Sequence, residues 1–191
     1  MNKLIIGIVA IIVTVLTSGV QADENQPAVR AAVPQGAVQD AFENSLKAYF
    51  DIQVALSEDD LERAEEGASR LLQALTGVPM KDMPADFHAV WMKSVPNLKA
   101  STDAVNTASN LGDARQAFES LSLAMLNLVR NVDYTGDVPV YQYHCPMAFH
   151  NKGADWLQDK EGTANPYFGA AMYRCGKLEA QIHEAPGGGA R

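Results

Sequence analysis

Soft sulfur ligands are concentrated near the C-terminal end of this 191-residue chain. Both cysteines, Cys145 and Cys175, lie in the segment 141–176 together with Met147 and Met172. Cys145 and Met147 are two residues apart, so in an extended strand their side chains point to the same face. Met172 and Cys175 are three residues apart and share one side of a helical turn. Because thiolate and thioether ligands select Cu(I) over hard cations, the pattern predicts a soft-metal site.

Two histidines in the same segment, His144 and His150, widen the choice of metal. Imidazole ligands would extend it toward Zn²⁺ or Cu(II). The alternative is a structural Cys145–Cys175 disulfide, because an exported protein with two cysteines is the usual setting for one. A reducible pair can also change between the two states. From the residues alone, the metal site and the disulfide both remain open.

The N-terminal segment Met1–Ala22 has the pattern of a secretory signal peptide. Lys3 supplies a positive charge, the apolar stretch Leu4–Leu16 follows it, and small side chains precede the expected cleavage point. The stretch is short for a membrane-spanning helix. We therefore expect cleavage after Ala22 and a periplasmic mature protein with no membrane span.

Charge and missing motifs exclude several classes of function. The formal net charge is −8, and signal cleavage would remove one base and no acid. An acidic chain does not bind phosphate backbones well, so we expect no nucleic-acid partner. The chain lacks the Cys-x-x-Cys motif of thioredoxin-like proteins, the Cys-x-x-Cys-His motif of c-type haem, phosphate-binding glycine loops and the Gly-x-Ser-x-Gly elbow. We expect no enzyme activity, and a protein with non-covalent haem or another redox centre is a third hypothesis.

Apolar residues recur at helical spacing between the leader and residue 132. We expect Pro34 in the first turn of one helix, Ser57 as the N-cap of the next and Gly77 at its end. Phe87–Trp91 suggests a short helix, and Pro96 is expected to begin another. The strongest stripe runs over 114–132. These amphipathic helices predict a mainly α fold, an up-and-down four-helix bundle.

The domain organisation follows from these patterns. Residues 138–143 favour extended structure, and 177–182 is expected to form a short strand. Asn165 and Gly169 are expected to shape a turn. We expect a signal peptide at 1–22, a flexible leader at 23–33, a single domain at 34–183 with a helical bundle at 34–132 and a Cys/Met/His cap of loops and short strands at 138–183, and a disordered tail at 184–191.

Four short motifs stand out in the C-terminal segment: Cys145-Pro146-Met147, Gly153-Ala154-Asp155-Trp156-Leu157, Asn165-Pro166-Tyr167-Phe168-Gly169 and Met172-Tyr173-Arg174-Cys175-Gly176. Together they resemble the motifs of an uncharacterised family of exported bacterial helical domains. The resemblance extends upstream to Tyr49, Leu56–Asp60 and Arg115–Ser122, so it covers nearly the whole mature chain. The sequence differs from the family pattern at Tyr173 and Gln158, and 150–152 lengthens the first loop.

Domains of this family also occur at the C-terminal end of periplasmic adaptor subunits of heavy-metal efflux pumps. The resemblance therefore implies a role in metal handling, as a chaperone, buffer or docking module, with Cys145, Met147, Met172 and Cys175 as Cu(I) ligands. The implied partners are the metal ion and an efflux-pump or envelope protein. The alternative is a non-enzymatic interaction module of an efflux or envelope system with a Cys145–Cys175 disulfide.

Overall fold

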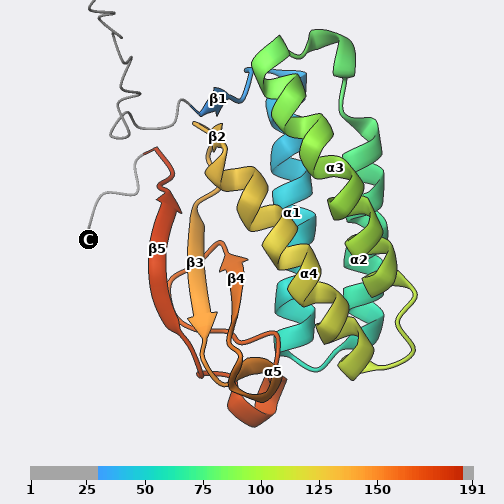
Figure 1. Ribbon diagram of the computed structural model, residues 1–191, viewed down its shortest axis with the longest axis vertical. Helices are drawn as coiled ribbons and strands as arrows, with labels where there is room; N and C mark the ends of the chain where they lie inside the picture. The colour runs from blue at the N-terminus through green and yellow to red at the C-terminus, as the bar shows by residue number, and fades with distance from the viewer. Residues whose placement is uncertain (1–29, 187–191) are drawn as a thin grey trace, which may run out of the picture.

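The computed structural model describes residues 30–186, which form four long helices followed by a small antiparallel sheet (Figure 1). This confirms the predicted mainly α fold. The predicted signal peptide, most of the leader and the end of the tail lie outside the described residues. The helices are α1 (Ala37–Ser57), α2 (Leu61–Gly77), α3 (Ala85–Asn106) and α4 (Leu111–Arg130), with the short helices η1 (Met80–Asp82), α5 (Ala148–Asn151) and η2 (Gly169–Met172).

Side-chain caps define where two of the helices begin. The carboxylate of Asp60 accepts the Arg63 N–H before α2, and the amide oxygen of Asn110 accepts the Asp113 N–H before α4, both at 3.0 Å. These bonds satisfy N–H groups that have no partner within the helix. The prediction that Ser57 caps α2 is wrong, because Ser57 ends α1. Pro34 was expected in the first turn of a helix, but α1 begins three residues later, at Ala37.

Helix α3 is continuous, although two shorter helices separated at Pro96 were predicted. Proline removes one backbone N–H and commonly ends or bends a helix. Here Pro96 is exposed, whereas Trp91 and Leu98 on either side of it are buried. The core contacts of the two halves lie on one stripe and keep the helix unbroken.

The sheet has the order β4-β3-β5, and all neighbouring strands are antiparallel. Its strands are β3 (Val140–Cys145), β4 (Ala154–Gln158) and β5 (Lys177–His183). The extended segment at 138–143 and the strand at 177–182 were predicted, but β4 was not.

A two-residue parallel pair joins β1 (Ala31–Ala32) to β2 (Val132–Asp133). Ala31 and Val33 are buried, so residues 31–33 belong to the domain and not to a flexible leader. The pairing attaches the start of the described chain to the end of α4.

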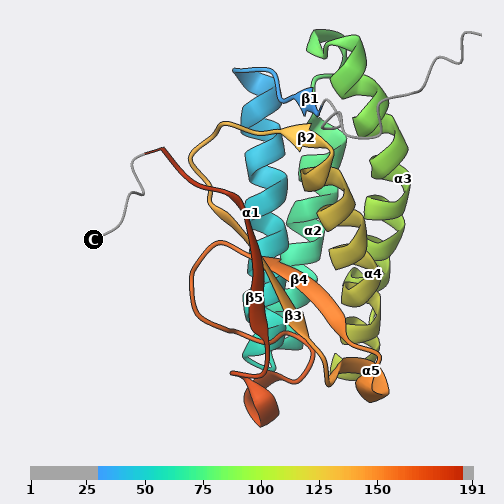
Figure 2. The same cartoon turned by 60° about the vertical axis from the view of Figure 1, so that its left-hand side comes forward.

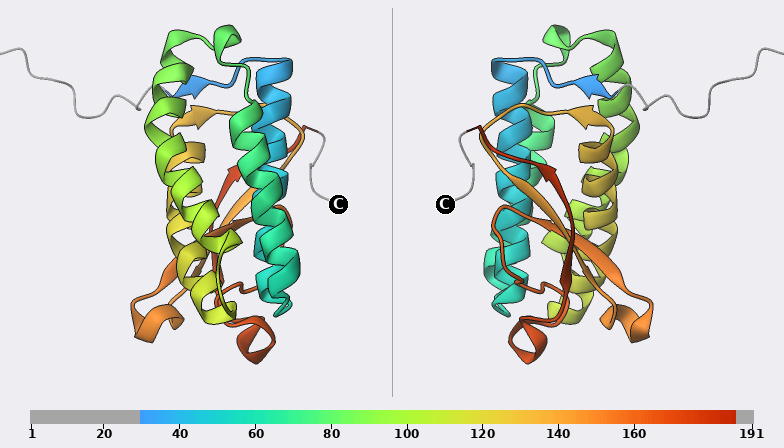
Figure 3. Two further views of the ribbon diagram at one scale, coloured as in Figure 1. Left: turned by 90° about the vertical axis from the view of Figure 1, so that its right-hand side faces the viewer. Right: turned by 90° about the vertical axis from the view of Figure 1, so that its left-hand side faces the viewer.

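The sheet closes the bundle on the side between α1 and α4, where β4 packs on both helices (Figures 2 and 3). Helices α1–α2, α2–α3 and α3–α4 pack directly on each other. Tyr49, Phe118 and Trp156 meet in one core, and all three are fully buried. Burying aromatic side chains contributes strongly to stability. The cap is therefore part of the hydrophobic core.

Within residues 30–186, no helix is both long and apolar enough to cross a bilayer.

Candidate functional site

The thiols of Cys145 and Cys175 are in contact, with 3.3 Å between the sulfur atoms. Cys145 is the last residue of β3, and Cys175 lies two residues before β5. Strand pairing explains their contact, because Lys177 of β5 is opposite His144 of β3. The two cysteines are free thiols in this structure. The structure thus brings together the two cysteines that the soft-metal site and the disulfide both require.

The two thiols differ in environment. Cys145 has no exposed surface, whereas Cys175 is partly exposed. Partial burial and the neighbouring Cys145 thiol raise the pKa of Cys175. A raised pKa keeps the thiol protonated near neutral pH, and both oxidation and metal binding require loss of that proton.

The backbone around Cys175 is fixed by hydrogen bonds. Its N–H donates to the Met172 carbonyl at 2.9 Å, and its carbonyl accepts from the side-chain amide of Asn165 at 2.6 Å. Gly176 follows at φ +140°, and a Cβ there would overlap the Trp156 ring. The close approach of Trp156 therefore requires glycine next to Cys175.

The two predicted methionine ligands lie near the thiols along the chain. Met172 is in the same turn as Cys175 and is half-buried. Met147, two residues after Cys145, is 47% exposed. Met172 has the better surroundings for a third soft ligand, because it shares a turn with Cys175 and is less exposed than Met147.

His144 lies apart from the thiols. Its Nδ1 atom is 2.7 Å from the Asp155 carboxylate, and its ring lines a pocket of about 270 Å³ that contains neither cysteine. Neighbouring residues of a strand face opposite sides, which separates the His144 ring from the Cys145 thiol. A Cβ at Gly153 (φ +78°) would overlap this ring, so the glycine gives His144 its space. The predicted grouping of His144 with Cys145 is not seen.

His150 is exposed and lies in a left-handed turn. Phe149, His150 and Asn151 have φ values of 49°, 60° and 65°. This conformation is unfavourable for residues that have a Cβ. The loop that follows Met147 is therefore a strained turn.

Asn165, which has no exposed surface, organises the loop that carries Cys175. Its side-chain oxygen accepts the Tyr167 N–H at 2.8 Å and the Phe168 N–H at 3.3 Å, as expected for a turn. Its backbone N–H donates to the backbone carbonyl of Tyr173 at 2.9 Å. The sequence indicated the turn but not the bond from Asn165 to the Cys175 carbonyl.

Three polar side chains connect the cap to the helices. Tyr49 Oη lies 2.7 Å from Ser122 Oγ and accepts the Leu157 N–H at 3.1 Å. The side-chain amide of Gln53 donates to the Ala164 carbonyl at 2.6 Å. Arg115 donates to the Pro166 and Leu56 carbonyls, each at 2.9 Å. Tyr49 and Arg115, singled out by resemblance, therefore hold the cap in place.

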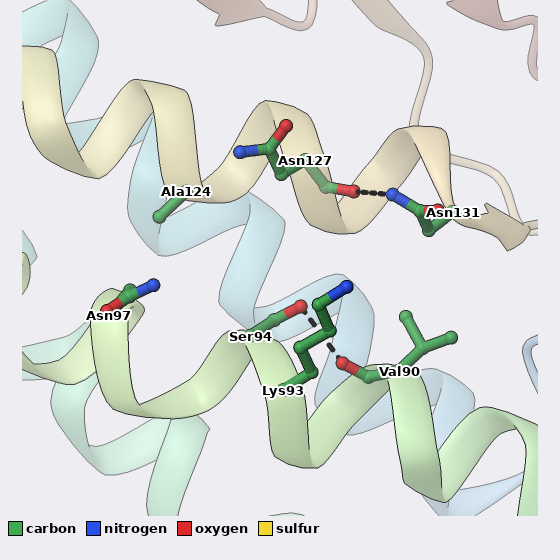
Figure 4. Close-up of a pocket in the computed structure, with 7 residues that line it drawn as sticks. All are labelled: Val90, Lys93, Ser94, Asn97, Ala124, Asn127 and Asn131. Carbon is green, nitrogen blue, oxygen red and sulfur yellow. Dashed lines mark hydrogen bonds between the residues drawn. The ribbon is translucent and has the colours of Figure 1, made fainter.

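A second surface feature lies between α3 and α4, a groove of about 400 Å³ (Figure 4). Ser94 donates to the Val90 carbonyl at 2.9 Å, and the Asn131 amide donates to the Asn127 carbonyl at 2.7 Å (Figure 4). These polar groups thus bond within their own helices. Lys93 is the one charged residue among those that line the groove.

Among residues 30–186, no three side chains of the types His, Cys, Asp and Glu are grouped so that they could hold a metal ion. A metal site here would therefore depend on two thiols with thioether help.

Residues 46–136, which make up most of the helical bundle, match the family described as "Protein of unknown function (DUF3347)". The match ends before β3, so it does not include Cys145, Cys175 or the four motifs of the cap. No curated protein and no solved structure is significantly similar to the chain.

Proposed function

We propose that this protein, whose helical segment matches a family of unknown function, is a periplasmic Cu(I)-binding protein that acts in metal handling or resistance. The observation that carries the proposal is the 3.3 Å contact between the Cys145 and Cys175 sulfurs. Two sulfurs at this separation are close enough for one soft ion to contact both. Thiolates are the side chains that select Cu(I) most strongly over hard cations.

Met172 is the proposed auxiliary ligand. It lies in the turn that leads to Cys175, and its carbonyl accepts the Cys175 N–H at 2.9 Å. A thioether is neutral and soft, so it adds affinity for Cu(I) without attracting hard cations. Met147, which is more exposed, is the second-choice ligand.

Binding must release protons, because both cysteines bind metal as thiolates. The pKa of Cys175 is raised by its burial and by the Cys145 thiol. We therefore expect Cu(I) affinity to increase with pH through the neutral range, where protons compete with the metal for this sulfur.

A second candidate function is a non-enzymatic interaction module of an efflux or envelope system, stabilised by a Cys145–Cys175 disulfide. The complete burial of Cys145 favours this alternative. So does the hydrogen-bond network of Asn165, which fixes the loop that carries Cys175. In this alternative the cysteines attach the cap to itself and do not need to bind a ligand.

The test is an anaerobic competition titration of reduced protein with Cu(I) and a coloured chelator. Wild type is compared with Cys145→Ser/Cys175→Ser, with Met172→Leu, and with Met92→Leu as a control for an exposed methionine on α3. We expect one ion per chain, loss of binding in the double variant and weaker binding in Met172→Leu alone. Absence of competition by wild type would overturn the copper proposal and favour the disulfide module.

Export is tested separately by cell fractionation and by the mass of the purified protein. The proposal requires a periplasmic chain that begins after Ala22. A full-length chain in the cytoplasm would contradict it.

A further inference from the structure

The unequal exposure of the two cysteines determines which sulfur a partner can reach. Cys145 has no exposed surface, and Cys175 is partly exposed. Thiol–disulfide exchange requires a thiolate to approach one disulfide sulfur from outside. In the oxidised protein the accessible sulfur would be that of Cys175.

We propose that the oxidised protein, with a Cys145–Cys175 disulfide, is reduced by a thioredoxin-like dithiol protein that attacks Cys175 Sγ. The inference rests on the proposed function, because thiols in an oxidising compartment must be reduced before they bind Cu(I). The sulfurs are already in contact, so oxidation and reduction require little movement of the cap.

Exposed apolar side chains near the cysteines fit a protein reductant. Met147, Tyr173 and Leu178 are 47%, 36% and 49% exposed, and each lies within three residues of a cysteine. We call these three residues the cap rim. Apolar side chains exposed next to the cysteines along the chain offer contact points to a protein that must approach the Cys175 sulfur. The disulfide chemistry identifies the occupant, because a dithiol protein can both dock on the rim and supply two electrons.

The reaction has two balanced steps. The partner thiolate attacks Cys175 Sγ, a bond forms between these sulfurs, the Cys145–Cys175 bond breaks, and the electron pair leaves on Cys145, which takes up a proton. The other cysteine of the same partner protein, as a thiolate, then attacks the partner sulfur that is bonded to Cys175 Sγ. Cys175 leaves with the electron pair and is protonated, and the partner dithiol has become a disulfide.

The experiment traps the mixed disulfide. The protein is oxidised with diamide and mixed with a thioredoxin variant whose second active-site cysteine is serine. Free thiols are alkylated, and the attached cysteine is identified by peptide mass spectrometry. We expect Cys175 to carry the thioredoxin in about tenfold excess over Cys145. Attachment mainly to Cys145, or no adduct while a small phosphine reduces the disulfide, would overturn the proposal.

The rim is tested by the rate of reduction with wild-type thioredoxin. Leu178→Asp should reduce the rate several-fold, and Met92→Asp on α3, a matched exposed apolar residue, should not change it. Reduction by the phosphine should be equal in all variants, which shows that the disulfide itself is unchanged. Equal thioredoxin rates in Leu178→Asp and Met92→Asp would refute a role of the rim.

The two proposals can fail independently. The Cu(I) titration uses protein reduced chemically, so it does not depend on how reduction occurs. If reduced protein binds Cu(I) but diamide produces no Cys145–Cys175 disulfide, this inference is wrong and the proposed function stands. If the mixed disulfide forms on Cys175 but no Cu(I) binds, the exchange site stands and the metal-binding function is wrong.

Discussion

Asp59, in the turn between α1 and α2, accepts a hydrogen bond at 2.9 Å from the backbone N–H of Ala170, which lies 111 residues further along the chain. The same carboxylate forms an ion pair with Arg115 of α4. Asp59 itself has φ 62°. The turn between α1 and α2 thus holds the start of η2 through the Asp59 carboxylate.

The first prediction concerns pH. The Ala170 N–H, followed by the Arg115 guanidinium, lowers the pKa of Asp59. Because the folded pKa lies below the unfolded value of about 3.9, the carboxylate stabilises the fold above that pH and loses this effect as the pH falls through the folded pKa. Asp59→Asn should therefore unfold at lower urea concentration than wild type at pH 7, with a difference that shrinks below about pH 4.

Asparagine tolerates the left-handed conformation of residue 59, so this substitution isolates the charge. Asp103→Asn, on an exposed part of α3, is the control and should show no such difference. If the loss of stability in Asp59→Asn stayed constant from pH 7 to pH 3, the ionised Asp59 carboxylate would not be the stabilising group.

The second prediction concerns the Tyr49 hydroxyl. Tyr49→Phe leaves the Leu157 N–H and the buried Ser122 hydroxyl without their partner. We expect the free energy of unfolding to fall by about 1–3 kcal/mol. Tyr141→Phe, at a half-buried position of β3, should change it much less. Equal effects in urea titrations of the two variants would show that the Tyr49 hydroxyl does not hold the cap.

The third prediction compares two glycines with positive φ. A Cβ at Gly169 (φ +57°) would overlap the Asp59 carboxylate and Arg115, whereas a Cβ at Gly162 (φ +89°) meets no atom within 4 Å. Gly162→Ala should cost about 1–2 kcal/mol from backbone conformation alone. Gly169→Ala should cost clearly more, because it also breaks the Asp59 bonds. Thermal unfolding of both variants measures the difference, and a smaller loss for Gly169→Ala would refute the close packing.

The fourth prediction concerns oxidation. A Cys145–Cys175 disulfide would close a loop of 30 residues. Chain entropy then predicts that the oxidised protein is about 3–4 kcal/mol more stable than the reduced protein. Urea unfolding with and without reductant measures this, and Cys145→Ser/Cys175→Ser should be indifferent to reductant. A reduced protein as stable as the oxidised one would exclude a structural role for the bond.

The fifth prediction concerns the left-handed turn at His150. His150→Gly should raise stability by about 1 kcal/mol, because glycine adopts positive φ without strain. His88→Gly, within α3, should instead lower it. Cu(I) affinity should be unchanged in His150→Gly, since His150 is exposed and the proposed ligands are elsewhere. A loss of affinity would restore His150 to the set of metal ligands.

Much of the bundle could be predicted from spacing, because helix stripes are local. The predicted stripe over 114–132 is buried as expected, from Ala114 to Val132. The break at Pro96 was wrong because local propensity does not record the core contacts that continue α3 across it. Strand β4 was missed because Asp155 and Gln158 leave only a short apolar run. Its position depends on pairing with β3, which is not a local property.

The candidate site was predicted in part. The contact of Cys145 with Cys175 depends on the register of β5 against β3, which spacing alone does not give. The separation of His144 from Cys145 could have been foreseen, because adjacent strand residues face opposite sides. The sequence indicated Asn165 only as a turn residue, because the Cys175 carbonyl, which accepts from its side-chain amide, lies ten residues away.

The placement of the sheet against α1 and α4 also bears on how the protein can be divided. The segment that matches the family, 46–136, begins inside α1 and ends before β3. Cutting the chain there would remove Val38 and Phe42 from the core and uncover the faces that meet Trp156 and Tyr167. The matched segment is therefore smaller than the hydrophobic core of the described residues. A recombinant fragment confined to 46–136 would expose apolar faces that favour aggregation, whereas one covering 30–186 would keep Val38, Phe42, Trp156 and Tyr167 in place.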